Sequence, residues 1–209
     1  MSADIVQGSA SWFADRLGKV TASRVADVIA KTKSGYSTSR ENYCVELALE
    51  RITCKRSESF SNAAMTWGTE TEPLARAEYE AMTGAIVDEI GMVPHPSIAM
   101  TGASPDGLID DDGLIEIKCP QSATHAKTLL SQKPDGKYIT QMMWQMICTG
   151  RKYCDFVSFD PRFPEHLQLC VIRVDRNEQR CAELEIAVTV FLAEVNEMVA
   201  TLLSMKEAA

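Results

Sequence analysis

Two carboxylates and a lysine near the middle of the chain, Asp106, Glu116 and Lys118, have the types and spacing needed for hydrolysis at a metal ion. Asp106 follows Ser-Pro and precedes Gly, which is typical of a turn. Residues 114–119 alternate apolar and polar, as a half-buried strand does, so Glu116 and Lys118 would project from one face. The acidic run 110–113 predicts a hairpin turn that folds Asp106 back beside them.

This combination of groups has a definite chemical use. Mg²⁺ binds one or two carboxylates and keeps several waters, through which it meets substrate phosphates. A nearby lysine can orient or deprotonate an attacking water and stabilise charge that develops on phosphorus. The alternative is a solvated hairpin with a surface Glu–Lys pair, because a bare D-x(n)-E-x-K pattern is common by chance. Its apolar neighbours favour the first interpretation, since charges beside a core are costly unless they are used.

Composition predicts one intracellular-type domain. The 209 residues, 45% of them hydrophobic, suffice for a single domain over residues 1–209 with a sizeable core. We expect no membrane-spanning segment, because no apolar run looks long enough, and no secretory signal. Seven cysteines without a C-x-x-C pair indicate reduced thiols rather than a zinc site or a disulfide framework. The three histidines, His95, His125 and His166, lack ligand spacing and are expected to be structural or exposed.

Charge is distributed unevenly along the chain. The net charge of −8 argues against indiscriminate coating of nucleic acid. Residues 16–40 nevertheless carry +5, which fits a focused phosphate-binding spot, although an ordinary solvated helix face is the alternative. Thr21 and Ser23 begin a predicted helix whose free N–H groups could hold a phosphate with Arg16, unless they serve only as caps. Lys33 could reach a ligand from the predicted loop 31–39.

Hydrophobic periodicity places these residues on elements. It predicts helices over 11–18, from 21, and over 39–54, 62–83, 122–132, 137–149 and 177–205. It predicts strands, besides the hairpin, over 85–93, 98–103, 153–159 and 167–174. This order predicts an α/β domain with a central mixed sheet and helices on both faces.

Two helices carry further candidate residues. Pro73 predicts a kink or a helix restart, so Glu72 could point inward, although a first-turn carboxylate is the alternative. Tyr138, Gln141 and Gln145 share one stripe of their helix. That stripe could meet a phosphate or a water, although Met and Trp at helical spacing are more typical of core packing.

Five segments in order resemble the lambda exonuclease family, also called YqaJ-type viral recombinases, within the restriction-endonuclease-like PD-(D/E)XK nucleases. They are WFADRLGKVTAS from Trp12, WGTETEP from Trp67, SPDG from Ser104, EIKCP from Glu116 and YITQMMWQ from Tyr138. The resemblance covers about residues 12–175 and implies a restriction-endonuclease-like core.

The resemblance implies roles at the catalytic centre. Asp106 and Glu116 would be the principal ligands of one or two Mg²⁺ ions, with Mn²⁺ as a substitute and the main-chain carbonyl of Ile117 completing a site. Lys118 would position and activate the water. The remaining members of the centre would be Glu72, which supports the metal site, and Gln141, which contacts the reacting atoms. Related nucleases often carry Tyr four residues after this Gln, so Gln145 is given no role.

The resemblance also implies a DNA-binding site. Arg16, Ser23 and Lys33, with Ser104, would bind the 5′-phosphate of the degraded strand. Lys33 stands where arginine is usual, and lysine lacks the bidentate fork of arginine. Met65 would be an apolar wedge that separates the terminal base pairs.

The implied activity is 5′-to-3′ degradation of one strand from a duplex DNA end, leaving a 3′ tail for a single-strand annealing protein. A homotrimeric ring and a cytoplasmic location in a bacterial host, for a phage- or prophage-type protein, are also implied. One alternative is a structure-specific or restriction-type endonuclease with the same metal centre. Another is a DNA-end-binding module that recruits the annealing protein without cutting, against which the intact Asp106, Glu116 and Lys118 count.

Overall fold

The structure is a computed structural model that describes residues 7–56 and 63–205. Its helices are α1 Ala10–Arg16, η1 Ala22–Arg24, α2 Val25–Val28, α3 Thr38–Thr53, α4 Ala63–Thr83, α5 Ser122–Ser131, α6 Gly136–Thr149, α7 Glu165–Gln168 and α8 Glu178–Ser204. Its strands are β1 Val20–Thr21, β2 Lys31–Thr32, β3 Gly35–Tyr36, β4 Val87–Asp88, β5 Val93–Pro94, β6 Thr101–Ala103, β7 Gly107–Ile109, β8 Gly113–Lys118, β9 Tyr153–Phe159 and β10 Leu169–Asp175.

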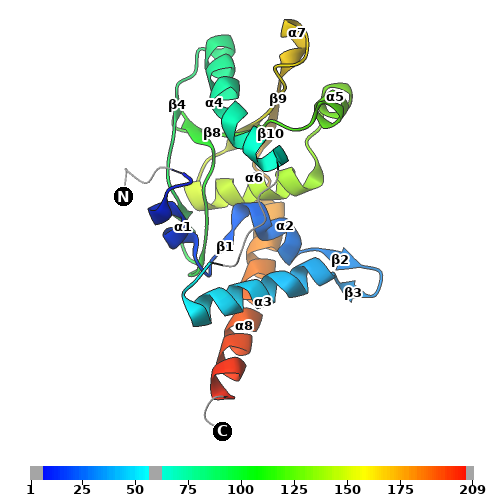
Figure 1. The fold of residues 1–209 in the computed structure, drawn as a ribbon. Coiled ribbons are helices and arrows are strands. Elements are labelled where there is room, and N and C mark those ends of the chain that lie inside the picture. Colours follow the sequence, from blue (N-terminus) through cyan, green and yellow to red (C-terminus); the bar gives the residue numbers. More distant parts are fainter. Residues whose placement is uncertain (1–6, 57–62, 206–209) are drawn as a thin grey trace.

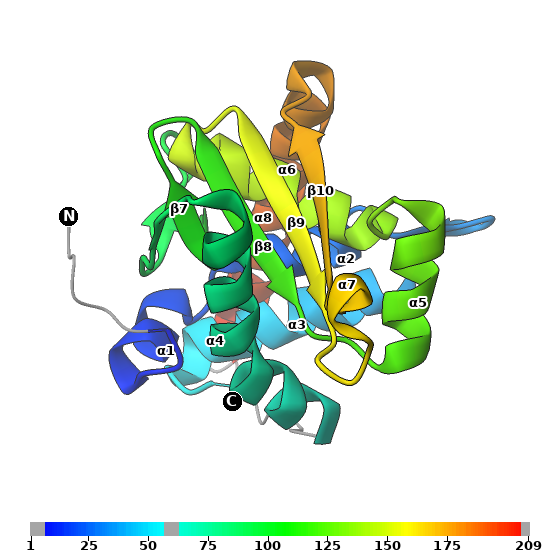
Figure 2. The ribbon, with the colours of Figure 1, turned by 90° about the horizontal axis from the view of Figure 1, so that it is seen from above.

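A five-stranded mixed sheet forms the centre, in the order β10-β9-β8-β7-β4. Strands β8 and β9 run parallel, and the other neighbours run antiparallel. Figure 2 shows α4 across one face of this sheet and α6, α2, α3 and α8 behind the other. The predicted fold class, a central mixed sheet with helices on both faces, is confirmed.

Strand β8 positions the acidic residues because its side chains alternate between two cores. Ile115 and Ile117 pack with the cluster under α4, whereas Leu114 packs with the larger cluster of α2, α3, α6 and α8. Glu116 lies on the Leu114 side of the strand, and α6 covers that side. Buried residues of α6 include Met142, Met143, Trp144, Gln145, Met146 and Ile147.

A second, smaller sheet brings the N-terminal segment to the centre of the chain. Strand β1 pairs in parallel with β6, aligning Val20 with Thr101 and Thr21 with Gly102. A Cβ at Gly102 would lie 2.6 Å from the Val93 carbonyl oxygen, so only glycine allows β5 and β6 to approach this closely. The end of α1 is thereby placed beside the segment that leads into Asp106.

One local prediction was wrong, and at Pro73 one of the two predicted alternatives is excluded. Residues 31–36, predicted as part of a loop, form the β2–β3 hairpin. Helix α4 continues through Pro73 without a restart. Pro73 and Thr69 are both exposed, so the Thr69 carbonyl that loses its helical partner can be hydrated. The strands predicted at 85–93 and 98–103 are short, with β4, β5 and β6 covering only parts of them.

Helix α8 is the longest element and extends away from the rest of the chain (Figure 1). By length and mean hydropathy alone it could cross a membrane, so the expectation that no apolar run reaches this length was wrong. One of its faces packs against the domain, and the ring of Phe191 stacks on Tyr43 of α3 at 5.5 Å. The residues buried on this face are Cys181, Leu184, Val188, Phe191, Leu192 and Val195.

Arg40 ties the β2–β3 hairpin, α2 and α8 together. Its guanidinium donates to both oxygens of Glu194, at 2.6 and 2.9 Å, and to the Val28 carbonyl at 2.9 Å. It also lies 3.8 Å from the Tyr36 ring centroid. Only 5% of Arg40 is exposed, so these partners replace its hydration.

We therefore expect Arg40→Met to lower the free energy of unfolding by about 2 kcal/mol, because it leaves the Val28 carbonyl and Glu194 without this donor. Urea denaturation followed by circular dichroism measures the change. The matched control is Arg180→Met, which removes an exposed pair with Glu183 and should cost less than about 0.5 kcal/mol. Equal losses in the two variants would contradict the role of Arg40.

Candidate active site

The β7–β8 hairpin brings Asp106, Glu116 and Lys118 together. Lys118 Nζ forms an ion pair with Glu116 Oε1 on the same face of β8. Asp106 Oδ2 accepts a hydrogen bond of 2.6 Å from the main-chain N–H of Ile117, which holds this carboxylate against the strand. The turn is closed at Asp110, whose φ of 45° is one that aspartate tolerates well. The convergence predicted from the alternating pattern is therefore present.

Helix α6 presents two amides to the same carboxylate. Gln141 Nε2 donates to Glu116 Oε1 at 2.7 Å, and Gln145 Nε2 donates to Glu116 Oε2 at 2.6 Å. The Glu116 side chain is fully buried. Gln145 was missed as a functional candidate, although its place on one helical stripe with Tyr138 and Gln141 was visible in the sequence. Tyr138 also faces the site, with its ring centroid 5.5 Å from Lys118 Nζ.

Electrostatics couple these groups strongly. Burial raises the pKa of the Asp106 carboxyl well above its ordinary value, and the charge of Glu116 raises it further. Burial alone would lower the pKa of Lys118, but Glu116 and Asp106 outweigh it and raise that pKa. Lys118 therefore stays protonated at neutral pH, which suits it to stabilising negative charge and orienting water.

Glu72 lies at the edge of this group, on α4. Its carboxylate pairs with Arg76 one turn later, at 3.1 Å. Burial raises the pKa of Glu72; Arg76 and Lys118 oppose that shift, and Glu116 adds to it. The charges of Lys118 and Glu116 therefore act on Glu72, and its supporting role at the metal site stays a prediction.

The oxygen donors present fit Mg²⁺ better than a metal ion that requires three or more protein ligands. In residues 7–56 and 63–205, no three His, Cys, Asp or Glu side chains are grouped as a metal site. Mg²⁺ does not need such a group, because one or two carboxylates with water suffice. Asp106 and Glu116 supply hard oxygens whose mutual repulsion a divalent cation would relieve. The Ile117 carbonyl as a third ligand stays a prediction.

Arg16 and Ser104 form a second group beside the first. Ser104 Oγ accepts hydrogen bonds from Arg16 Nη1 and Trp12 Nε1, both at 3.1 Å. The Arg16 guanidinium lies 4.0 Å from the Trp12 ring centroid. A cavity of about 180 Å³ extends from this group to Gln141, the amide that donates to Glu116. Its lining is Gln7, Trp12, Arg16, Ala22, Ser23, Ser104 and Gln141.

Arg16 is poised to bind an anion. Burial lowers its pKa to about 10; Tyr43 opposes this shift and the nearby Arg56 adds to it. A bound phosphate would offset both the burial and the repulsion.

The helix predicted from Thr21 is only a 3₁₀ turn followed by the four residues of α2. Toward a phosphate, Ser23 would therefore offer its exposed hydroxyl, which contacts Thr21 Oγ1 at 3.4 Å, rather than a helix dipole.

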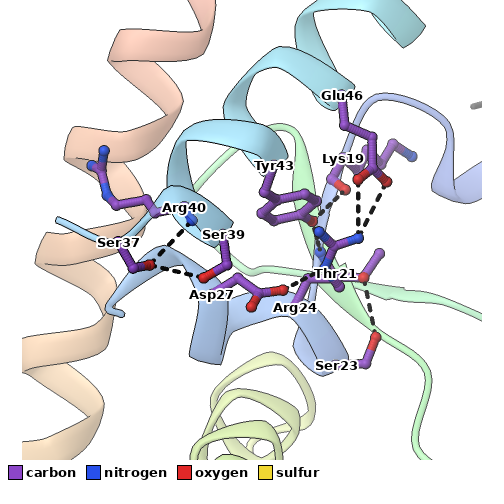
Figure 3. A network of polar contacts seen from close by, with 10 residues as sticks. All are labelled: Lys19, Thr21, Ser23, Arg24, Asp27, Ser37, Ser39, Arg40, Tyr43 and Glu46. Carbon is purple, nitrogen blue, oxygen red and sulfur yellow. Dashed lines mark hydrogen bonds and ion pairs between the residues drawn. The ribbon is translucent and has the colours of Figure 1, made fainter. Parts of the chain in front are cut away.

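A larger cavity of about 450 Å³ adjoins Arg16, and Met65 lies on its wall. Arg24, also on this wall, is held by Asp27 at 2.6 Å and by Glu46, with the Tyr43 ring beneath it (Figure 3). Arg24 is thus already neutralised. Met65 is 54% exposed, which suits an apolar contact with an entering duplex end.

Lys33 does not join this site within one chain, so its predicted place beside Arg16 and Ser23 was wrong. It is exposed in the turn between β2 and β3 and lines neither cavity. Figures 1 and 2 show the hairpin projecting on the side opposite α1. The contacts of Arg40 with Tyr36 and Glu194 hold it there.

Comparison with known proteins now places the chain in a family. The YqaJ-like viral recombinase domain matches residues 11–152, a range that contains every candidate residue from Arg16 to Gln145. The chain belongs to the YqaJ-like viral recombinase family. Among curated proteins, none matches it.

The chain is also similar to solved structures of exonucleases. The alkaline exonuclease LHK-Exo of Laribacter hongkongensis, in complex with dAMP, is 50% identical with a TM-score of 0.91, over 96% of this chain and 100% of that one. A second LHK-Exo structure has 50% identity and a TM-score of 0.89, over 96% and 98%. A phage-related exonuclease of Haemophilus somnus 129PT shares the fold, with 13% identity and a TM-score of 0.68 over 88% and 96%.

Proposed function

We propose that the protein is a Mg²⁺-dependent exonuclease that digests one strand of duplex DNA from its 5′ end and leaves a 3′ single-stranded tail. The observation that carries this proposal is the position of Ser104. It binds Arg16, which is suited to an anion, and lies two residues before Asp106. An end phosphate bound at Arg16 would therefore lie beside the hydrolytic centre. The family and the dAMP complex of LHK-Exo, a mononucleotide of the kind such an enzyme releases, support it.

The chain's own residues would divide the work. Asp106 and Glu116 would hold Mg²⁺, which supplies Lewis-acid polarisation of the scissile phosphate. Lys118 would orient the attacking water and stabilise the charge that develops on phosphorus. The P–O3′ bond breaks, the terminal nucleotide leaves with its 5′-phosphate, and the shortened strand carries a new 5′-phosphate. Rebinding of that phosphate at Arg16, Ser23 and Ser104 would make digestion processive.

The proposed function also implies an oligomeric state, a partner protein and a location. A homotrimeric ring around the duplex, a single-strand annealing protein that receives the 3′ tail, and a bacterial cytoplasm as the location remain predictions. A structure-specific endonuclease with the same centre is the nearest alternative. Arg16 and Gln141 line one cavity, so an end phosphate bound at Arg16 would lie close to the amide that holds Glu116, which favours an enzyme that acts at ends.

Digestion of linear duplex DNA, labelled separately at each 5′ and 3′ terminus, tests this function. The reactions contain Mg²⁺ or EDTA, and a closed circular duplex is the control. We expect metal-dependent release of 5′-terminal mononucleotides with the circle intact. Nicking of the circle would establish the endonuclease, whereas binding without any cleavage would establish a recruitment module.

Arg16→Ala is expected to lower processivity and to remove the preference for 5′-phosphorylated over 5′-hydroxyl ends. Loss of a charge-assisted hydrogen bond to phosphate corresponds to roughly a 10–100-fold change in that preference. Initial rates on the two end types measure it. Lys33→Ala is the matched control, because Lys33 lies away from the pocket and should retain the preference. If Arg16→Ala still discriminates between the ends, the phosphate binds elsewhere.

A further inference from the structure

Glu116 is held by two amides that differ in one respect, their access to solvent. Both come from α6, from positions one turn apart, and each takes one carboxylate oxygen. Gln141 is partly exposed and lines the 180 Å³ cavity. Gln145 is fully buried. Gln141 can therefore meet a ligand in the cavity, whereas Gln145 can contact only other protein groups.

The orientation of the Gln145 amide leaves its oxygen atom without a hydrogen bond. Its Oε1 is buried and has no hydrogen-bond partner among the described residues. Turning the amide over would place that oxygen against Glu116 Oε2, where the donor now lies at 2.6 Å, and two acceptors would repel. An unpaired buried oxygen is unfavourable and rare in native structures. The side chain is thus fixed by its bond to Glu116.

The Gln141 bond is the one that can be exchanged. Its acceptor, Glu116 Oε1, is also the oxygen paired with Lys118. Loss of the Gln141 donor would leave Oε1 with a charged partner, and Gln141 could turn into the cavity it lines. Oε2, by contrast, accepts its hydrogen bond from the fully buried Gln145, so Gln145 is the amide that holds this oxygen.

We propose that Gln145 is a positioning residue: it holds Glu116 Oε2 throughout the reaction and keeps Oε1 directed at the metal and substrate, while Gln141 exchanges between Glu116 and the bound DNA. This role rests on the proposed function, because it presumes a divalent metal at Asp106 and Glu116. Partners that orient a metal-binding carboxylate typically affect metal affinity by about 10–100-fold.

Mn²⁺ binding, followed by the electron paramagnetic resonance signal of the free ion, tests this role without requiring turnover. We expect Gln145→Met to bind Mn²⁺ about 10–100-fold more weakly than wild type. Gln141→Met, the matched variant one turn away, should bind Mn²⁺ nearly as wild type does. The Mg²⁺ concentration for half-maximal cleavage should rise in Gln145→Met, with much of the rate restored at high Mg²⁺.

The outcomes separate the two proposals. If Gln145→Met binds Mn²⁺ as tightly as wild type, the positioning role is overturned, but the proposed nuclease function still stands. Absence of Mn²⁺ binding and of cleavage in the wild type would overturn both.

A measurement on the wild type covers the case in which Gln145→Met fails to fold. In NMR spectra, the Gln145 side-chain amide protons should exchange slowly with water and stay at hydrogen-bonded shifts when Mg²⁺ is added. Those of Gln141 should move. A Gln145 amide that exchanges rapidly, or moves to a solvent-exposed shift with Mg²⁺, would overturn the positioning role.

Discussion

Lys118→Ala is expected to reduce cleavage of linear duplex DNA by about 10³-fold while the affinity for DNA ends changes little. Lys118 is the cation paired with Glu116, and the charges of Glu116 and Asp106 keep it protonated. Its removal takes away the group proposed to orient water and offset charge on phosphorus. It leaves Arg16 and Ser104, the proposed end-binding pair, untouched.

Single-turnover cleavage of an end-labelled duplex measures the loss, and fluorescence anisotropy with Ca²⁺ in place of Mg²⁺ measures binding. Lys137→Ala is a close control. Lys137 lies 4.8 Å from the centroid of the same Tyr138 ring that Lys118 approaches, but it is exposed at the start of α6. It should cleave at nearly the wild-type rate. Unchanged turnover in Lys118→Ala would remove Lys118 from the mechanism.

Asp106→Asn is expected to abolish cleavage and yet to stabilise the metal-free protein at alkaline pH. Burial and the charge of Glu116 raise the folded-state pKa of Asp106 above its unfolded value. Its contribution to stability is therefore present below the unfolded pKa and is lost as pH rises through the folded pKa. Asparagine removes this buried charge and still offers an oxygen to the Ile117 N–H.

Thermal unfolding between pH 5 and 9 tests this expectation. In EDTA at the alkaline end, the Tm of Asp106→Asn should exceed that of wild type by a few degrees, since 1 kcal/mol corresponds to about 2–4 °C at this chain length. The difference should shrink toward acid pH, and Mg²⁺ should raise the wild-type Tm only. Asp110→Asn, in the exposed hairpin turn, should change nothing. A lower Tm for Asp106→Asn at alkaline pH would show that the carboxylate is favourably held without metal.

The convergence of Asp106, Glu116 and Lys118 could be predicted from the sequence because its geometry is local. Period-two alternation places Glu116 and Lys118 on one face of β8, and the turn at Asp110 returns Asp106 to them. The stripe of Tyr138, Gln141 and Gln145 follows likewise from helical spacing. These contacts need only one hairpin and the helix that covers it.

The predictions that were wrong or left open depend mostly on contacts between distant segments. The position of Lys33 depends on the Arg40–Glu194 pair, whose members are 154 positions apart. The helical spacing of α6 placed Gln145 on one stripe with Tyr138 and Gln141 but could not identify Glu116 as its partner. Continuity of α4 at Pro73 depends on which side of the helix meets solvent, and the short elements after Thr21 depend on the pairing of β1 with β6.

A Mn²⁺ anomalous difference map from crystals of the protein with a 5′-phosphorylated duplex end tests the proposed centre most directly. We predict a peak between the carboxylates of Asp106 and Glu116, with a DNA phosphate at Arg16 and Ser104. A peak elsewhere in the molecule, or no peak at saturating Mn²⁺, would contradict a metal-dependent nuclease centre at the β7–β8 hairpin.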